Sequence, residues 1–434
     1  MSRNDKTAPY VESFEEISKT LPGAWLADTR SNAIRQFEAE GFPTPRTEAW
    51  KYTNLNRLTR AGFNIAGISG VSGASEWSEL VIDGADTIVI VNGSYDASAS
   101  KKGAVPIGVS IAPLSEAIER KEPSLEGRLT KIAPTHGAPL VALNTAFMRE
   151  GVVLKLGDDI KLEQPIQVIH FVEASDTRLS VHPRTLLVAG ENSSATFIET
   201  FVGSAGSVYW TNAVTEIEVG CGASILHVKR QAESLEGFHT ALTQAKLDRN
   251  ARYHSVSLTT GASISRNEVR VSFNGEGAEA LMAGGTLLRG RQHADNTTQI
   301  EHTVPHTSSN QIFRNVLDGA AHSVFQGGVM VRQDAQKTDS SQSNHNILLS
   351  SGAQADTKPE LQIFADDVKC AHGATVGDLD ETALFYLQSR GIPARRAKAL
   401  LIEAFIAEIS DALSTGAVRD HVVDAVSAWM EDLG

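Results

Sequence analysis

The stretch EVGCGASILHV, residues 218–228, joins an apolar alternation, a glycine-containing turn and an alanine that opens a second alternation. The same order of features recurs in VAGENSSATFIE (188–199), KLDRNARYHSV (246–256) and FNGEGAEALMA (273–283). The alanines that open the second alternation are 28, 28 and 27 residues apart, namely Ala195, Ala223, Ala251 and Ala278. A near-constant period of this length indicates stacked repeats.

Most of the chain from about Gly151 to Thr375 is typical of β-strand. Apolar and polar residues alternate before the turns, as in 215–219 and 269–273. We therefore expect one side of each strand to be buried and the other, which carries Glu216, Glu218 and Arg270, to face water. Short strands with tight turns and no intervening helices favour a parallel β-helix. A β-sandwich with coincidental spacing is the alternative.

Helical patterns flank this β-region, so we predict a mainly β fold with α-helical regions at both ends. The expected divisions are an N-terminal helical region with a Pro-containing arm (1–60), a mixed linking region leading into the β-helix (61–150), the β-helix core (151–377) and a C-terminal helical domain (378–434). In the arm, FPTPRTEAWKYTNL (42–55), the prolines disfavour helix, while Trp50 and Tyr52 offer large faces for docking.

The C-terminal region carries two apolar stripes at helical spacing. The first consists of Ala397, Leu400, Leu401, Ala404, Phe405 and Ile409, and the second of Val422, Val423, Val426, Trp429, Met430 and Leu433. The stripes either pack into a core or leave one face open for a partner, and a core is the more common arrangement.

Composition narrows the class of protein. The chain is 41% hydrophobic and 21% charged, and it lacks an apolar run of the ~20 residues that a membrane span requires, so we expect a soluble protein with no membrane partner. No secretory segment is evident at the start and there are two cysteines, which favours a reducing, cytoplasmic setting. A net charge of -13 without a basic block argues against nucleic-acid binding.

The sequence lacks the motifs of a self-contained hydrolase or nucleotidase. It has no Walker-type phosphate loop, no G-x-S-x-G and no H-E-x-x-H. Asp366 and Asp367 are adjacent, so on a strand they point to opposite sides, and a solvated turn explains them better than paired catalysis. His302 and His306 have helix-like ligand spacing in a strand context, which favours structural roles. Cys221 is interpreted as a small buried thiol.

Cys370 and His372, in DDVKCAHGATVG (366–377), are the strongest metal-ligand candidates. On an extended strand, residues two apart project to one side and present a thiolate and an imidazole to iron or zinc. A buried thiol beside a hydrogen-bonded histidine fits the spacing equally well. Tetrahedral sites usually need four ligands, so the remaining ones would come from another chain.

Four stretches resemble the SufB/SufD family of iron–sulfur cluster assembly proteins, and the block from Ala335 to Ile392 is the most specific. The stretches are RTEAWKYTNL (46–55), AQKTDSSQSNHNILLS (335–350), ADTKPELQIFADDVKCAHGATVG (355–377) and LFYLQSRGI (384–392). The EAWKYT arm and Gly373 after His372 resemble the SufD branch, because SufB usually has Cys-Glu-His-Glu at that turn.

The resemblance implies a right-handed parallel β-helix and a non-catalytic scaffold subunit of a cytoplasmic SufBCD complex. The chain would pair with SufB through the β-helices and bind the ABC-type ATPase SufC through C-terminal helices. His372, with Cys370 beside it, would help to hold iron or a nascent cluster shared transiently with SufB, and ATP would enter only through SufC. The SufC contact would involve Leu384, Tyr386, Leu387, Leu401 and Phe405.

Other functions stay open at this point. A β-helix carbohydrate-active enzyme, a lyase or hydrolase, is the alternative from another class. A homodimer is compatible with the scaffold, because an edge that meets SufB could meet its own copy when the chain is isolated. The cluster type, the sulfur donor, the entry of iron through this subunit and the involvement of a flavin are not disclosed by the sequence.

Overall fold

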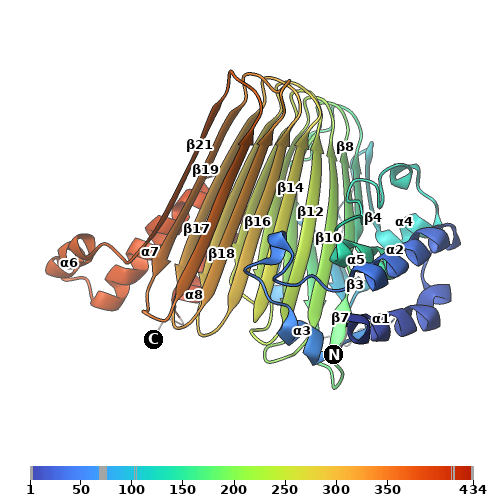
Figure 1. Ribbon diagram of the computed structural model, residues 1–434, viewed down its shortest axis with the longest axis horizontal. Coiled ribbons are helices and arrows are strands. Elements are labelled where there is room, and N and C mark those ends of the chain that lie inside the picture. Colours follow the sequence, from blue (N-terminus) through green and yellow to red (C-terminus); the bar gives the residue numbers. More distant parts are fainter. Residues whose placement is uncertain are drawn as a thin grey trace.

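Two sheets of mainly parallel strands face each other and form a β-helix with helices at both ends (Figure 1). The computed structural model describes residues 3–67, 76–101, 103, 105–411, 413 and 416–431. From residue 184 onward, consecutive strands alternate between the sheets, so each coil of the chain adds one strand to each sheet. The predicted β-helix with flanking helices is confirmed.

The strands of sheet A, from the C-terminal edge, are β20 (Gln354–Ile363), β18 (His322–Val331), β16 (His293–His302), β14 (Ile264–Phe273), β12 (Phe238–Leu247), β10 (Trp210–Val219), β8 (Arg184–Ala189), β5 (Val152–Leu156) and β4 (Val109–Pro113), with β7 (Leu179–Val181) and β1 (Asn64–Ile65) alongside. Sheet B contains β21 (Lys369–Gly377), β19 (Asp339–Leu348), β17 (Ser308–Leu317), β15 (Glu279–Leu288), β13 (Arg252–Thr259), β11 (Ser224–Ala232), β9 (Ser194–Gly203), β6 (Ile166–Val172), β2 (Asp86–Val91) and β3 (Ser94–Lys101).

One residue per coil, in the turn that leads into each strand from β9 to β19 of sheet B, adopts a positive φ. These residues are Asn192, Gly222, Asn250, Gly277, His306 and Lys337. Asparagine and glycine tolerate this left-handed conformation best, which explains why they mark the turns of the repeat. His306 is therefore a turn residue, which agrees with the structural role favoured for it over metal binding.

The strand register corrects one detail of the predicted repeat. Ser194 pairs with Ser224, and Ser224 pairs with Arg252. The residues that directly precede these three occupy one equivalent position in successive coils. Ser193, rather than Ala195, therefore corresponds to Ala223 and Ala251. The sequence pattern placed Ala195 two residues out of register because small residues occur at both positions.

The lumen between the sheets is apolar on one side and polar on the other. The apolar side is a continuous cluster that runs from Ile88 and Val152 to Phe325 and Ala335. On the polar side, equivalent side chains bond from coil to coil: Asn315 Nδ2 donates to Asn346 Oδ1 at 2.7 Å, and the Ser309 and Ser340 hydroxyls are 2.8 Å apart. The Ser- and Asn-rich segment 337–350 therefore contributes to side-chain ladders stacked from coil to coil.

The outer face of sheet A is also covered near its N-terminal end, which contradicts the expectation that Glu216 faces water. Glu216 is 0% exposed and forms an ion pair with Arg184 at 2.9 Å. Its carboxylate also accepts hydrogen bonds from the backbone N–H groups of Thr130 and Ala133. The covering segment comes from residues about 85 positions earlier, so a local alternation could not reveal it.

The N-terminal helices cover one end of the β-helix (Figure 1). They are α1 (Arg3–Ile17), α2 (Ala27–Glu40), α3 (Asn56–Ala61), α4 (Leu114–Glu119) and α5 (Pro139–Phe147). An aromatic cluster joins α1 and α2 to the start of β10: the ring centroids of Tyr10 and Trp210 are 6.1 Å apart, and those of Phe37 and Phe42 are 5.1 Å apart.

The C-terminal helices are α6 (Glu381–Ser389), α7 (Ala394–Ser410) and α8 (Ala417–Glu431), and α7 and α8 pack on the outer face of sheet B. The buried face of α7 consists of Ala397, Ala399, Ile402, Ile406 and Ile409. The predicted stripe was rotated: Leu401 and Phe405 are only half-buried and Ala404 is exposed, because the contact with the sheet selects the neighbouring helix face. Val422, Val426, Trp429 and Met430 are buried, Val423 is 43% exposed, and Leu433 lies outside the described residues.

Candidate functional site

The β-helix ends with two exposed edges, β20 and β21 (Figure 1). In the described part of the chain neither strand has a neighbour on its outer side. Lys369 N–H donates to the Thr338 carbonyl, so in this parallel ladder the backbone groups of Cys370, His372, Ala374 and Val376 point to the open side. These groups are free to pair with another strand.

The two edges differ in their capacity for strand pairing. Gln354 N–H donates to the Ala321 carbonyl, so the odd-numbered residues of β20 direct their backbone groups outward. One of them is Pro359, which has no N–H, and it is flanked by Lys358 and Glu360. Proline and charged residues on an edge suppress strand addition, so β21 is the better edge for a partner.

Cys370 and His372 lie on β21 and project to the same side, towards the lumen. Cys370 is half-buried and packs against the apolar core, whereas His372 is exposed because no further coil covers it among the described residues. Burial, followed by the charge of Asp339, raises the pKa of the Cys370 thiol. A metal ion would therefore have to displace a proton at neutral pH.

The two side chains fit part of a metal site. A thiol and an imidazole suit iron or zinc, and the open edge gives a second chain access to them. No group of three or more His, Cys, Asp or Glu side chains suited to hold a metal exists within the described residues. Ligands from this chain alone would leave the coordination shell incomplete.

The other sequence candidates have structural surroundings. His302 is 0% exposed, stacks on Phe273 with ring centroids 4.5 Å apart, and bonds to Thr307 Oγ1 at 2.7 Å. Cys221 is half-buried in the turn before β11. Asp366 and Asp367 are exposed in the turn before β21, and Asp367 forms an ion pair with Lys337.

The residues predicted to contact a partner through the C-terminal helices lie on two different elements. Leu384, Tyr386 and Leu387 belong to α6, which has no buried residue in the described part of the chain. Leu384 and Leu387 are half-buried, while Tyr386 is 56% exposed. Phe385 is 73% exposed and was missed, although it stands inside the quoted LFYLQSRGI stretch. On α7, Phe405 lies under the guanidinium of Arg314 at 5.9 Å.

A charged cluster inside the lumen was also missed by the sequence reasoning. Glu199 is 2% exposed and accepts hydrogen bonds from Thr185 and Thr215 at 3.0 Å, and its Oε2 lies 2.9 Å from His227 Nε2. Burial alone would raise the pKa of Glu199, but His227 and the nearby charges bring it to about 2. Burial lowers the pKa of neighbouring Lys229 to about 8. The available signal was polar residues at inward positions of successive strands.

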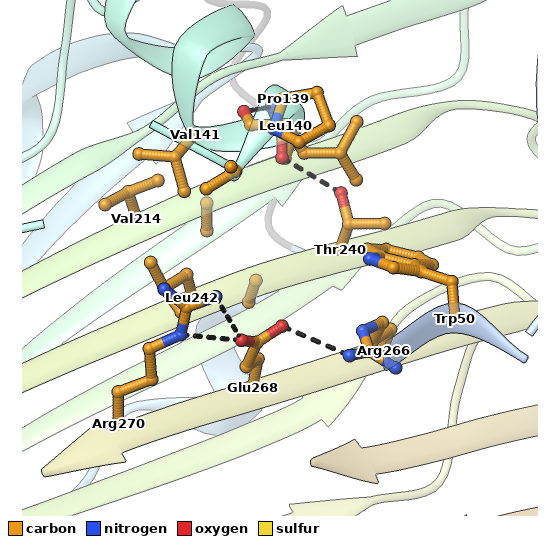
Figure 2. Close-up of a pocket in the computed structure, with 15 residues that line it drawn as sticks. Trp50, Pro139, Leu140, Val141, Val214, Thr240, Leu242, Arg266, Glu268 and Arg270 are labelled. Atoms are coloured by element: carbon orange, nitrogen blue, oxygen red, sulfur yellow. Dashed lines mark hydrogen bonds and ion pairs between the residues drawn. The ribbon is translucent and has the colours of Figure 1, made fainter. Parts of the chain in front are cut away.

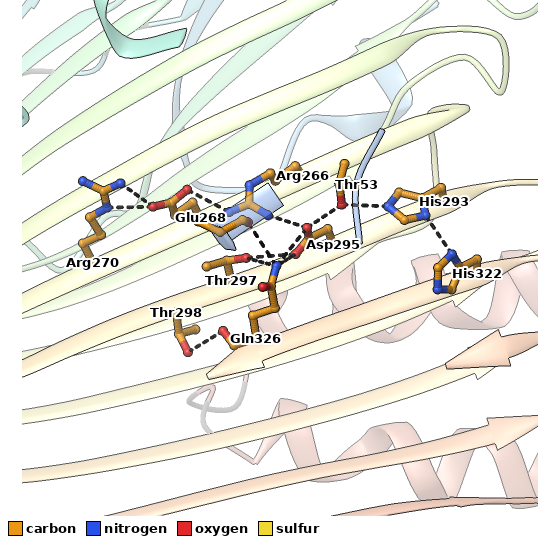
Figure 3. A network of polar contacts seen from close by, with 11 residues as sticks. Thr53, Arg266, Glu268, Arg270, His293, Asp295, Thr297, Thr298, His322 and Gln326 are labelled. Atoms are coloured by element: carbon orange, nitrogen blue, oxygen red, sulfur yellow. Dashed lines mark hydrogen bonds and ion pairs between the residues drawn. The ribbon is translucent and has the colours of Figure 1, made fainter. Parts of the chain in front are cut away.

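The N-terminal arm crosses the outer face of sheet A and closes a second polar network (Figure 3). Thr53 is 0% exposed, donates to Asp295 Oδ2 at 2.5 Å, and lies 2.9 Å from His293 Nε2. Asp295 also pairs with Arg266, whose guanidinium lies 4.2 Å from the Trp50 ring centroid. The expected docking of the arm through Trp50 is thus internal to the chain.

A pocket beside this network is too small for an organic ligand (Figure 2). Trp50, Leu140, Thr240, Arg266 and Glu268 line it, together with nearby residues of β10 and β12. The space that admits water is ≈ 50 Å³, enough for a few water molecules. Its charged groups are already paired, since Glu268 binds both Arg266 and Arg270. We interpret the pocket as a packing gap beneath the arm.

None of the described helices is long and apolar enough to cross a membrane.

Comparison with known families identifies two consecutive matches. The family described as "SUF system FeS cluster assembly, SufBD core domain" matches residues 171–405, and the one described as "SufBD protein N-terminal region" matches residues 4–168. The core match spans the strands from β7 to β21, as well as α6 and most of α7.

Curated relatives cover almost the whole chain. An iron–sulfur cluster assembly SufBD family protein of Synechocystis is 31% identical over 412 residues, which are 93% of this chain and 90% of the relative. The iron–sulfur cluster assembly protein SufD of Escherichia coli is 30% identical over 402 residues, 90% of each chain. The chloroplastic protein ABCI7 of Arabidopsis thaliana is 32% identical over 444 residues, 97% of this chain and 91% of the relative.

Proposed function

The chain belongs to the SufBD family of iron–sulfur cluster assembly proteins, and on that premise we propose that it is a non-catalytic, SufD-type scaffold subunit. It pairs with SufB, binds the ATPase SufC, and contributes His372 and Cys370 to a site for iron or a nascent cluster. The cluster is cargo that passes through the complex. Family membership supports this scaffold role over the carbohydrate-active alternative.

One observation carries this proposal: the last strand of the β-helix, which bears the two ligand candidates, has no neighbour on its outer edge among the described residues. On β21 the side chains of Cys370 and His372 face the lumen, while their backbone groups face the open side. A strand of SufB that pairs with β21 would therefore bring its own side chains beside this thiol and imidazole. The interrupted edge of β20 directs the pairing to β21.

Pairing through β21 is tested by introducing proline at an outward backbone position. Ala374→Pro removes one free N–H without breaking a hydrogen bond to β19, so SufB co-purification should fall at least tenfold. Ala355→Pro is the matched control, because it removes an outward N–H from β20, and it should leave SufB binding unchanged. Both variants are checked for wild-type circular dichroism. Equal binding of SufB by Ala374→Pro and wild type would refute pairing through β21.

The ligand role of His372 is tested in the complex with SufB and SufC. We expect His372→Ala to lower the iron and sulfide content of the purified complex while SufB and SufC stay bound, because the side chain is exposed and makes no core contact. Equal iron content in the two complexes would remove His372 from the ligand set.

SufC docking is assigned to α6 and the neighbouring surface of α7. The exposed rings of Phe385 and Tyr386 support this assignment, since large apolar side chains on a helix without buried residues favour a partner. Tyr386→Asp should abolish SufC co-purification, and a charged residue at Leu401 or Phe405 should also weaken it. Val423→Asp on α8 is the control, because Val423 is also an exposed apolar residue at 43%. Retained SufC binding by Tyr386→Asp would move the docking site elsewhere.

A further inference from the structure

Several polar atoms near the open end of the lumen have no hydrogen-bond partner among the described residues. They are Gln342 Nε2 and Oε1, Asn344 Nδ2 and Thr357 Oγ1. Gln342 is 3% exposed and Asn344 is 1% exposed. Leaving a buried polar atom without a partner is unfavourable, so each such group calls for an explanation.

The strand register places these groups next to the proposed cluster site. Gln342 on β19 pairs with His372 on β21, and Asn344 pairs with Ala374. Register partners on adjacent parallel strands project to the same side, about 4.8 Å apart. The Gln342 side chain therefore lies one strand below His372, facing the same lumen.

The Gln342 carboxamide reaches across the lumen towards sheet A. A Cβ atom built on Gly327 of β18 would lie 3.2 Å from Gln342 Nε2, so the glycine leaves room for the amide. Thr357 lies on β20, the strand that follows β18 in sheet A, and its side chain also faces the lumen. Both sheets thus supply polar atoms to the mouth of the lumen.

A hydrogen bond from Asn346 fixes the orientation of the Asn344 carboxamide. Asn346 Nδ2 donates to Asn344 Oδ1 at 2.9 Å, which leaves Asn344 Nδ2 as the free donor. One coil deeper, Gln311 is the register partner of Gln342, and its Oε1 accepts from Thr298 Oγ1 at 2.5 Å. Gln311 therefore has its carboxamide oxygen engaged and only its Nε2 without a partner, whereas both polar atoms of Gln342 are free.

We infer that Gln342, Asn344 and Thr357 form a neutral hydrogen-bond donor set for the sulfur atoms of the cargo held at His372 and Cys370. This inference rests on the proposed function and adds residues to its site. Sulfide and thiolate sulfur carry negative charge and accept N–H and O–H hydrogen bonds, which stabilise iron–sulfur units and tune their potentials. Amide and hydroxyl donors supply this stabilisation without burying an ionic group.

The test compares iron retention with the stability of the unloaded chain. Gln342→Met removes both free polar atoms at similar volume, so the melting temperature of the isolated chain should stay equal or rise. In the complex with SufB and SufC, the same variant should lose iron to a chelator roughly tenfold faster than wild type. Thr357→Val is a second, nearly isosteric variant with the same expected direction. Gln311→Met, one coil deeper, should keep the wild-type rate of iron loss.

Each outcome decides the inference. Wild-type iron loss in both Gln342→Met and Thr357→Val would overturn the donor set, and so would a lowered melting temperature that accounts for the faster loss. If His372→Ala abolishes iron retention while these two variants do not change it, the proposed function stands and the donor set falls. If the wild-type complex holds no iron, the proposed cluster site and the donor set both fail.

Discussion

His227 and His372 occupy inward positions on strands of the same sheet, yet their surroundings differ completely. His227 is 2% exposed, lies 2.9 Å from Glu199 Oε2 and is also 2.9 Å from the Tyr253 hydroxyl. His372 is exposed, with an unengaged carboxamide beside it. The difference is the next coil: further coils cover His227, which has a partner at each ring nitrogen, whereas His372 lies where the stack of described coils ends.

The largest expected effect on stability comes from substituting the carboxylate beside His227, in the part of the β-helix that further coils cover. Glu199→Ala removes one of the two buried carboxylates near Lys229 and the hydrogen-bond partner of His227 Nε2, so it should lower the free energy of unfolding by about 3–5 kcal/mol in chemical denaturation. His372→Ala should change it by less than about 0.5 kcal/mol, because the side chain is already in water. A similar loss of unfolding free energy in the two variants would contradict the distinction between coils that a further coil covers and the exposed last coil.

The covered face of sheet A gives the next largest effect. Thr53→Val removes the hydroxyl that donates to the buried carboxylate of Asp295, and this should cost roughly 1.5–3 kcal/mol of unfolding free energy. Thr44→Val, at an exposed position of the same arm, should be nearly neutral. An unchanged stability in Thr53→Val would mean that the arm is not anchored through Thr53.

Acid should lower the free energy of unfolding because histidines buried in the β-helix, such as His302, bind protons more readily in the unfolded chain. Burial lowers the pKa of His302 from 6.5 to about 4, so between these values the unfolded chain binds more protons than the folded chain. Stability from this residue is complete above about pH 6.5 and is lost towards pH 4, at about 1 kcal/mol per pH unit. His302→Gln should reduce the slope of unfolding free energy against pH by that amount, and an unchanged slope would assign the acid sensitivity to other groups.

The smallest effect is a change in the alkylation rate of Cys370, in the last coil, and not a change in stability. Because burial raises the pKa of Cys370, its alkylation by iodoacetamide should quicken about tenfold per pH unit between roughly pH 7 and 8. The measurement uses a Cys221→Ser background and mass spectrometry of the peptide. A rate that is already at its plateau at pH 7 would show that the thiol is ionised there.

The sequence predicts this fold well because the repeat is local, whereas the exceptions depend on distant residues. Asparagine or glycine marks the left-handed turn before β9, β11, β13 and β15, so this part of the β-helix is readable from spacing alone, whereas His306 and Lys337 take that place in the next two coils. The burial of Glu216 depends on residues 130–133, and the buried face of α7 depends on its contact with sheet B. The exposure of His372 follows from where the stack ends, which a strand pattern does not encode.

Pro359 limits which sheet of the last coil could take up another strand. The N-terminal helices cover the opposite end of the β-helix, so a second copy of the chain could meet only the C-terminal end. A contact between two such ends uses the same surface on both chains and therefore closes after two copies. With the β20 edge interrupted by Pro359, this contact would be confined to β21 of sheet B, so Pro359→Val should strengthen self-association of the isolated chain in analytical ultracentrifugation while leaving it dimeric.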